Sequence, residues 1–336
     1  MAKKQITIPF FIPHMGCPQR CAFCSQWQVS GAASVPEPED IPRRIAEWTR
    51  SASSSIKHKE AAFFGGSFTG LPRDLQVRYL KEARGQKDAG AINAIRLSTR
   101  PDYIDEESIS LLLEYSVDTV ELGAQSFNDD ILTRSRRGHS ADDIRTAAKL
   151  INARGLNLVI QLMPGLPGDT REISLESARS ALRLKPSAVR LYPTVVLADT
   201  ELEKMMKAKN FTPLTLEEAV EWGADQLALF HEASIPVIRI GLHPFSPEQE
   251  LKIIAGPYST SLGFMVKARY RRRLLMKHFE GLERSPEGTD IEVQVPDHQL
   301  PEYIGHRREN ILFIKEHFKL HSFAIVPGTE NKIPVV

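Results

Sequence analysis

The sequence has few cysteines, no long apolar run and almost no net charge. Three of its 336 residues are cysteines, all between positions 17 and 24, which excludes a disulfide framework. No apolar run approaches the roughly 18 residues that a membrane span needs, so we expect no membrane partner. Lysine and arginine number 43 against 42 aspartates and glutamates. A globally polycationic or acidic protein is therefore excluded, although a local basic surface is not.

The composition and the start of the chain predict a folded protein of the cytoplasm. Hydrophobic residues make up 42% and charged residues 25% of the sequence, which is ordinary globular usage and argues against disorder. The basic residues Lys3 and Lys4 are followed by no apolar core and no small-residue cleavage site. A secretory signal is therefore not expected.

Short apolar stretches alternate with longer helical patterns along most of the chain. The stretches typical of strands are Ile6–Ile12, Ala61–Phe64, Ala94–Thr99, Thr119–Ala124, Asn157–Met163, Ala188–Tyr192 and Val237–Ile240. The stretches typical of helices are Ile41–Ala52, Leu75–Ala89, Glu106–Tyr115, Ala141–Arg154, Arg171–Leu184 and Leu216–Ala233. Strands that alternate with helices indicate βαβ units on a parallel sheet. Ser140, and Thr215 with Glu218, are predicted to cap two of these helices.

Polar and apolar residues alternate within five of the predicted strands. In the fourth strand, Val120 and Leu122 alternate with Glu121 and Gln125, and in the last strand Ile238 falls on the apolar side. A sheet between two helix layers is apolar on both faces. An ordinary (β/α)8 barrel also fills its interior with apolar side chains. The alternation therefore predicts an open or partial α/β barrel with helices outside and a polar, ligand-holding lumen.

The pattern changes after Leu242. Two strands are expected at Thr289–Val295 and Ser322–Val326, with a helix near Glu309–His317. We therefore expect residues 1–245 to form the barrel and residues 246–336 to form a small α+β extension.

A cysteine motif directly follows the first strand. It reads Gly16-Cys17-Pro18-Gln19-Arg20-Cys21-Ala22-Phe23-Cys24, with the spacing C-x3-C-x2-C. Three thiolates on one loop can hold an iron–sulfur cluster or a zinc ion. A structural zinc takes four ligands, and His14 is a candidate for the fourth. A four-iron cluster normally takes four cysteines, so here one iron would be left open to another ligand.

This motif, with an aromatic residue before its last cysteine, resembles the signature of the radical S-adenosylmethionine (SAM) superfamily. The resemblance implies that Cys17, Cys21 and Cys24 bind a 4Fe–4S cluster whose open iron chelates SAM. It implies reductive cleavage of SAM to a 5′-deoxyadenosyl radical that abstracts hydrogen from a substrate. It also implies a partial (β/α)6 TIM-like barrel, a reductant protein such as ferredoxin or flavodoxin, and Phe23 near the adenine.

Other motifs at strand ends resemble the same family. Gly65, Gly66 and Ser67 follow the second strand, where the resemblance implies contact between the backbone and the methionine end of SAM. A side chain at Gly66 would then intrude where the backbone meets the ligand. The resemblance further implies SAM contacts for the residues Ser98, Gln125, Arg137 and Gln161. The alternatives are an ordinary Gly-Gly turn, a solvated basic turn at Arg136–Arg137, and a Gln161 that touches only water.

Two further groups of residues are candidates for substrate contact. Arg190 and Tyr192 end the sixth strand, and Arg239 and His243 end the last, all on the lumen side. The alternative for Arg239 is a buried ion pair with Glu121. The basic run Lys267–Lys277 could contact RNA phosphates through Arg271, Arg272 and Arg273, or could be a solvated face.

Residues 6–260 resemble the subgroup that includes the catalytic subunit of the elongator complex, and less closely the oxygen-independent coproporphyrinogen dehydrogenase. The resemblance implies a tRNA or other RNA base as the substrate. A tetrapyrrole substrate is the second enzymatic alternative, and a non-catalytic, metal-stabilised RNA-binding protein is the third. The residues after position 245 show no glycine-rich pyrophosphate loop, so we do not expect the acetyltransferase chemistry of the elongator subunit.

Overall fold

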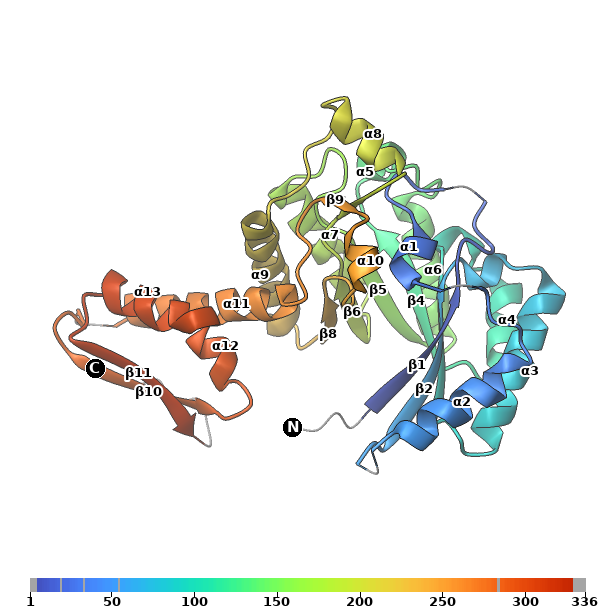
Figure 1. The fold of residues 1–336 in the computed structure, drawn as a ribbon, viewed down its shortest axis with the longest axis horizontal. Helices are drawn as coiled ribbons and strands as arrows, with labels where there is room; N and C mark the ends of the chain where they lie inside the picture. The colour runs from blue at the N-terminus through green and yellow to red at the C-terminus, as the bar shows by residue number, and fades with distance from the viewer. Residues whose placement is uncertain (1–4, 19, 33, 54, 283–284, 329–336) are drawn as a thin grey trace.

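A parallel sheet forms the centre of the molecule, a computed structural model that describes residues 5–18, 20–32, 34–53, 55–282 and 285–328. The basic start of the chain, residues 1–4, lies outside this range. The sheet has seven strands in the order β1-β2-β3-β4-β5-β6-β8 (Figure 1). Their bounds are β1 Gln5–Ile12, β2 His58–Gly65, β3 Ala94–Thr99, β4 Thr119–Gln125, β5 Asn157–Leu162, β6 Ala188–Leu191 and β8 Val237–Ile240. Each overlaps a predicted strand.

The sheet is curled but not closed. The strands β1 and β8 form its two edges, so the barrel is partial, as the sequence predicted. Every neighbouring pair is parallel, which places all the carboxyl ends of the strands at one rim. Loops that follow these strands therefore meet there, which is where barrel enzymes build their sites.

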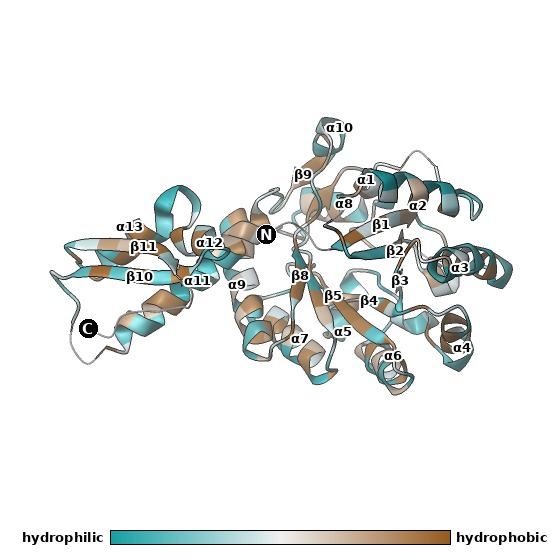
Figure 2. Cartoon of the chain, turned by 90° about the horizontal axis from the view of Figure 1, so that it is seen from below, coloured by the Kyte–Doolittle hydropathy of each residue, from teal (hydrophilic) through white to brown (hydrophobic). Residues whose placement is uncertain are grey.

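Helices cover the outer face of the sheet in an arc, which Figure 2 shows end-on. The main ones are α2 Asp40–Ser51, α3 Arg73–Asp88, α4 Glu106–Glu114, α6 Ala141–Ala153, α7 Arg171–Arg183 and α9 Leu216–Glu232. The largest apolar core lies between them and the strands, and it contains the fully buried Ile8, Leu97 and Val120. Ser140 and Thr215 form the predicted capping boxes of α6 and α9.

Several short elements were not predicted from the sequence. They are α1 Gln26–Ser30, the 3₁₀ turns at Phe68–Gly70, Pro101–Tyr103 and His306–Arg308, α5 Asp129–Arg134, β7 Val196–Leu197, α8 Glu201–Lys207, α10 Pro247–Glu250, β9 Ile253–Ala255 and α12 Leu300–Ile304. The strands β7 and β9 pair antiparallel, and with α8 they lie at the carboxyl rim of the sheet (Figure 1). These elements are too short for a periodic sequence pattern to reveal.

The C-terminal part has its own small core. Strands β10 Asp290–Pro296 and β11 Ser322–Gly328 pair in parallel, and α13 Glu309–His317 lies between them in sequence. The two strands and this helix occur where the sequence predicted them. The long helix α11 Leu262–Glu280 joins the two regions: Leu262 and Val266 pack with α9, whereas Leu275 and Phe279 belong to the C-terminal core. None of the described helices is long and apolar enough to cross a membrane.

Candidate functional site

The cysteine loop is fixed to the ends of other strands by backbone hydrogen bonds. The amide of Gly66 donates to the Ile12 carbonyl at 3.0 Å, and that of Ser67 donates to the Met15 carbonyl at 2.9 Å. The amide of Ala22 donates to the Ser135 carbonyl at 3.0 Å. The loop is therefore held between the end of β2 and the end of α5, at the carboxyl rim.

Two glycines allow the close approach of the β2 loop to the cysteine loop. A Cβ on Gly66 would lie 2.0 Å from the Met15 carbonyl oxygen, and one on Gly16 would lie 2.1 Å from the Ser67 carbonyl oxygen. The sequence argument placed a ligand at the missing side chain of Gly66. In the structure, the backbone of the cysteine loop occupies that space. Glycine is therefore required at position 66 by this loop, and the reason given from the sequence is corrected.

The cysteines lie among buried cationic groups. Arg137 is buried, and its guanidinium donates to Cys21 Sγ at 3.1 Å and to the Gly123 carbonyl at 2.6 Å. Burial raises the pKa of Cys24 to about 12. Burial also raises the pKa of Cys17, against the opposing effect of Arg100 and Arg137. In the described part of the chain, no three or more His, Cys, Asp or Glu side chains converge to hold a single metal ion.

Three of the predicted SAM-contacting residues lie on the lumen side, and Gln125 is close to Arg137. The Gln161 amide donates to Gln125 Oε1 at 3.0 Å. Gln125 follows a bulge in β4 and has a φ of +69°, a left-handed conformation that is uncommon for residues other than glycine. Ser98 Oγ and Arg137 Nε are buried without a hydrogen-bond partner. Buried polar atoms are rarely left unpaired, so these atoms fit a polar ligand at this rim.

Two other predicted cofactor residues have partners within the protein. Ser67 is fully buried, and its hydroxyl bonds Thr99 Oγ1 at 2.8 Å and accepts from the Arg100 amide at 3.2 Å. The backbone of Ser67 is engaged as well, because its amide donates to Met15 and its carbonyl accepts from the Gly70 amide at 3.0 Å. Phe23 packs against the apolar cluster around Leu202, near the carboxyl rim.

A chain of buried ion pairs crosses the lumen below this rim. Arg190 Nη1 lies 3.1 Å from Glu121 Oε1, and Arg96 lies 3.2 Å from Glu60 and 3.8 Å from Glu121. The Arg190 guanidinium lies over the ring of Phe64 at 5.0 Å. Glu121 Oε2 and Arg190 Nε are buried without a hydrogen-bond partner. The lumen is therefore polar, as the alternation predicted, and it keeps both a donor and an acceptor without a hydrogen bond.

The last strand departs from strict alternation. The register between β6 and β8 shifts after Val189, and Ile238 lines the lumen instead of the apolar outer face, so its predicted placement was wrong. Arg239 donates to the Gly241 carbonyl at 3.2 Å, and Glu121 pairs with Arg190 instead. The alternative that paired Arg239 with Glu121 is therefore wrong.

His243 and Tyr192 are the other two lumen residues predicted to contact the substrate. His243 lies beside the ring of Phe11 at 6.4 Å, where β8 approaches β1, and burial lowers its pKa. Burial raises the pKa of Tyr192, whose ring lies 6.0 Å from the Arg190 guanidinium.

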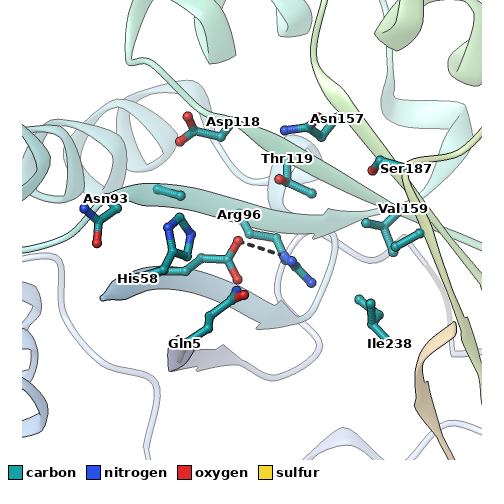
Figure 3. A pocket seen from close by; sticks show the side chains of 13 residues that line it. Gln5, His58, Asn93, Arg96, Asp118, Thr119, Asn157, Val159, Ser187 and Ile238 are labelled. Carbon is teal, nitrogen blue, oxygen red and sulfur yellow. Dashed lines mark hydrogen bonds and ion pairs between the residues drawn. The ribbon is translucent and has the colours of Figure 1, made fainter. Parts of the chain in front are cut away.

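The lumen is also open at the amino ends of the strands. A cavity of about 320 Å³ is lined there by the first residues of the strands, among them Gln5, His58 and Asn157 (Figure 3). The ion pair of Arg96 with Glu60 faces this cavity. A second hollow of about 530 Å³ lies at the other rim, beside Arg20 and His139.

The basic run on α11 forms ion pairs within the protein. Arg273 pairs with Glu221 and, at 2.7 Å, with Asp225, whereas Arg271 lies 3.3 Å from Glu302. Arg272 lies over the ring of Phe313 at 4.5 Å. Carboxylates already neutralise Arg271 and Arg273, and burial lowers the pKa of Arg272. These contacts join α11 to α9, α12 and α13, and they argue against the predicted phosphate-binding face.

The sequence reasoning missed some residues of the site. Glu60 lies directly before the predicted strand Ala61–Phe64. It was therefore not included among the polar residues predicted to face the lumen. The sequence indicates His14 only as a candidate zinc ligand, and no motif points to Gln26. The available signal for Glu60 was a carboxylate directly before the second strand, which neighbours the strand that carries Arg96.

Two models of known protein families match the sequence of this chain. The family model of the radical SAM superfamily matches residues 11–180, and that of a radical SAM C-terminal domain matches residues 186–272. The first match covers half of the chain. The chain therefore belongs to the radical SAM superfamily, and it is an enzyme.

Its relatives include elongator-type proteins. The tRNA uridine(34) acetyltransferase of Methanocaldococcus infernus is 32% identical over 182 residues, which cover 48% of this chain and 34% of that protein. Elongator complex protein 3 of Homo sapiens is 28% identical over 207 residues, which cover 56% of this chain and 38% of that protein. The chain thus spans little more than a third of these relatives.

Solved structures share the fold. Elp3 of Methanocaldococcus infernus with residues 1–46 deleted has a TM-score of 0.66 at 23% identity, covering 82% of this chain and 64% of that chain. Coproporphyrinogen III oxidase of Escherichia coli has a TM-score of 0.51 at 17% identity, covering 68% and 52%. At these identities the likeness concerns the fold alone, and the partial barrel of the radical SAM type is confirmed.

Proposed function

We propose that this protein binds a 4Fe–4S cluster through Cys17, Cys21 and Cys24 and uses SAM to abstract hydrogen from an RNA base. The observation that carries the proposal is the loop of three thiols at the carboxyl rim, with the buried Arg137 donating to Cys21 at 3.1 Å. Soft thiolates suit iron–sulfur centres, and a nearby guanidinium offsets their negative charge. The chemistry of these donors therefore fits the cluster.

When bound, such a cluster supplies the electron that cleaves SAM to methionine and a 5′-deoxyadenosyl radical. The residues around it hold and orient the ligand. The backbone at Gly65, Gly66 and Ser67 holds the cysteine loop in place, and the methionine end would lie beside this contact. Ser98, with its unpaired hydroxyl, and the pair of Gln125 with Gln161 offer hydrogen bonds from the lumen side.

The lumen below this rim would take the substrate. Arg190 Nε and Glu121 Oε2 offer a buried donor and a buried acceptor that form no hydrogen bond within the protein. A ligand with an N–H beside a carbonyl, as on the edge of a nucleobase, complements both groups. Tyr192, Arg239 and His243 would line its approach. The names of the elongator-type relatives support a tRNA base.

The donor of electrons would be a ferredoxin or flavodoxin in the cytoplasm. It would approach the outer side of the cysteine loop, where Pro18 and Arg20 are exposed. A tetrapyrrole substrate remains the second enzymatic alternative, and no contact in the lumen favours it.

The test is SAM cleavage by anaerobically reconstituted protein with a chemical reductant. We expect 5′-deoxyadenosine, measured by mass spectrometry, to form faster when bulk tRNA is added. Cys17→Ala should form none, because no spare cysteine exists. Stimulation by coproporphyrinogen but not by tRNA would refute the RNA substrate. Absence of 5′-deoxyadenosine under every condition, from protein with full iron and sulfide, would refute the radical chemistry.

A further inference from the structure

Two residues that flank the cysteine motif are joined by a reciprocal pair of hydrogen bonds. His14 lies before Cys17, and Gln26 follows Cys24 as the first residue of α1. The backbone amide of His14 donates to Gln26 Oε1, and the backbone amide of Gln26 donates to His14 Nε2 at 3.2 Å. Each side chain is thus oriented by the backbone of the other residue.

This pair determines which atoms carry protons. Because His14 Nε2 accepts a hydrogen bond from an amide, the proton of the neutral ring must lie on Nδ1. His14 Nδ1 lies 4.0 Å from Cys24 Sγ. Likewise, Gln26 Oε1 is taken by an amide, so its NH₂ group points the other way. A side-chain hydrogen bond from Gln26 opposes the burial that raises the pKa of Cys17 and of Cys24. Both side chains therefore direct N–H donors at cysteine sulfur atoms.

The backbone at His14 is strained. Its φ of +57° lies in the left-handed region, which costs an L-residue other than glycine or asparagine roughly 1 kcal/mol. Such strain persists where surrounding contacts hold it, and here the two hydrogen bonds with Gln26 do so. A glycine at position 14 would remove the strain but would also remove the imidazole ring. The strained backbone therefore positions this ring.

We propose that His14 and Gln26 are positioning residues whose N–H groups donate to the thiolates of Cys24 and Cys17 and thereby raise the reduction potential of the cluster. This inference rests on the proposed function, since it requires a cluster on these cysteines. Donors to cluster sulfur atoms stabilise the more negative, reduced state. His14 would then act through Cys24 and would not be a ligand itself.

The test is a redox titration of the reconstituted protein, followed by electron paramagnetic resonance. The variants are His14→Asn, which tolerates the left-handed backbone, and Gln26→Leu. The matched control is Gln28→Leu, two residues along α1, where the amide donates to the Ala198 carbonyl. At a fixed potential, we expect the ratio of reduced to oxidised cluster to fall at least threefold in both variants. That is a shift of about 30 mV for a one-electron couple.

The control should keep the wild-type potential. Full iron content with an unchanged potential in both variants would overturn the inference, and so would loss of iron from His14→Asn, because iron loss indicates a ligand. The protonation of His14 is tested separately on the cluster-free protein by ¹⁵N nuclear magnetic resonance of labelled histidine. A proton on Nε2 would also overturn the inference. If the wild type binds no cluster, the proposed function fails, while the histidine measurement still tests the contact.

Discussion

Replacement of Gly66 by alanine should displace the cysteine loop. The new Cβ would lie 2.0 Å from the Met15 carbonyl oxygen and 2.7 Å from that of Ile12, and both are backbone atoms that no rotamer change can move. Restoring a normal contact needs a shift of about 1 Å in the loop, and overpacking of this kind costs about 1–3 kcal/mol. For a chain of this length that cost lowers the Tm by about 1–4 °C.

The same shift should impair cluster binding. Metal-site geometry tolerates displacements of only about 0.5 Å, so we expect iron and sulfide per chain to fall at least about twofold after reconstitution. The matched control is Gly85→Ala in α3, where a Cβ would meet nothing within 4 Å. The control should keep full iron and gain about 0.5–1 kcal/mol of stability, because alanine is the better helix residue. Equal iron content and Tm in Gly66→Ala and wild type would refute the reasoning.

Three further outcomes follow from the buried charges. Glu121→Gln should lower the free energy of unfolding in urea by about 3–5 kcal/mol, because it leaves Arg190 buried without its carboxylate. The control is Glu107→Gln at an exposed position, which should change this free energy by less than about 0.5 kcal/mol. Equal effects of the two variants would contradict the reasoning. Burial lowers the pKa of His139 to about 4 from 6.5, so the unfolded chain takes the proton first and stability falls as the pH drops through this window. Between pH 7 and pH 5 this loss is about 2 kcal/mol, and His139→Gln should remove most of it in a urea titration at each pH. Replacement of Arg271, Arg272 and Arg273 by glutamine should leave the salt dependence of tRNA binding unchanged; a slope flatter by about three units would restore their predicted phosphate contacts.

The barrel was predictable because its signals are local and repeated. Alternation of Leu122 with Glu121 placed one on the outer core and the other in the lumen, and the same pattern in neighbouring strands implied a polar interior. The cysteine spacing identified the family from residues that lie on one loop. Ile238 was misplaced because a bulge between strands shifts the register, and the sequence of one strand does not contain that information.

Long-range pairings could not be read from the sequence. The arginines of α11 looked like a cationic face, because the carboxylates that neutralise them, Glu221 and Asp225, lie on α9 about 50 residues earlier in the chain. The contact of His14 with Gln26 depends on a left-handed φ that histidine rarely adopts. Such contacts follow from the folded backbone, so they appear only once the loops are placed.

The central claim is that Cys17, Cys21 and Cys24 hold a four-iron cluster with one iron open to SAM. The most direct measurement is electron paramagnetic resonance of the reduced, anaerobically purified protein, with iron and acid-labile sulfide counted in the same sample. We predict about four irons and four sulfides per chain, and a spectrum that changes when SAM is added, because SAM binds the open iron. Bound zinc without sulfide, or a cluster spectrum that SAM leaves unchanged, would contradict the account.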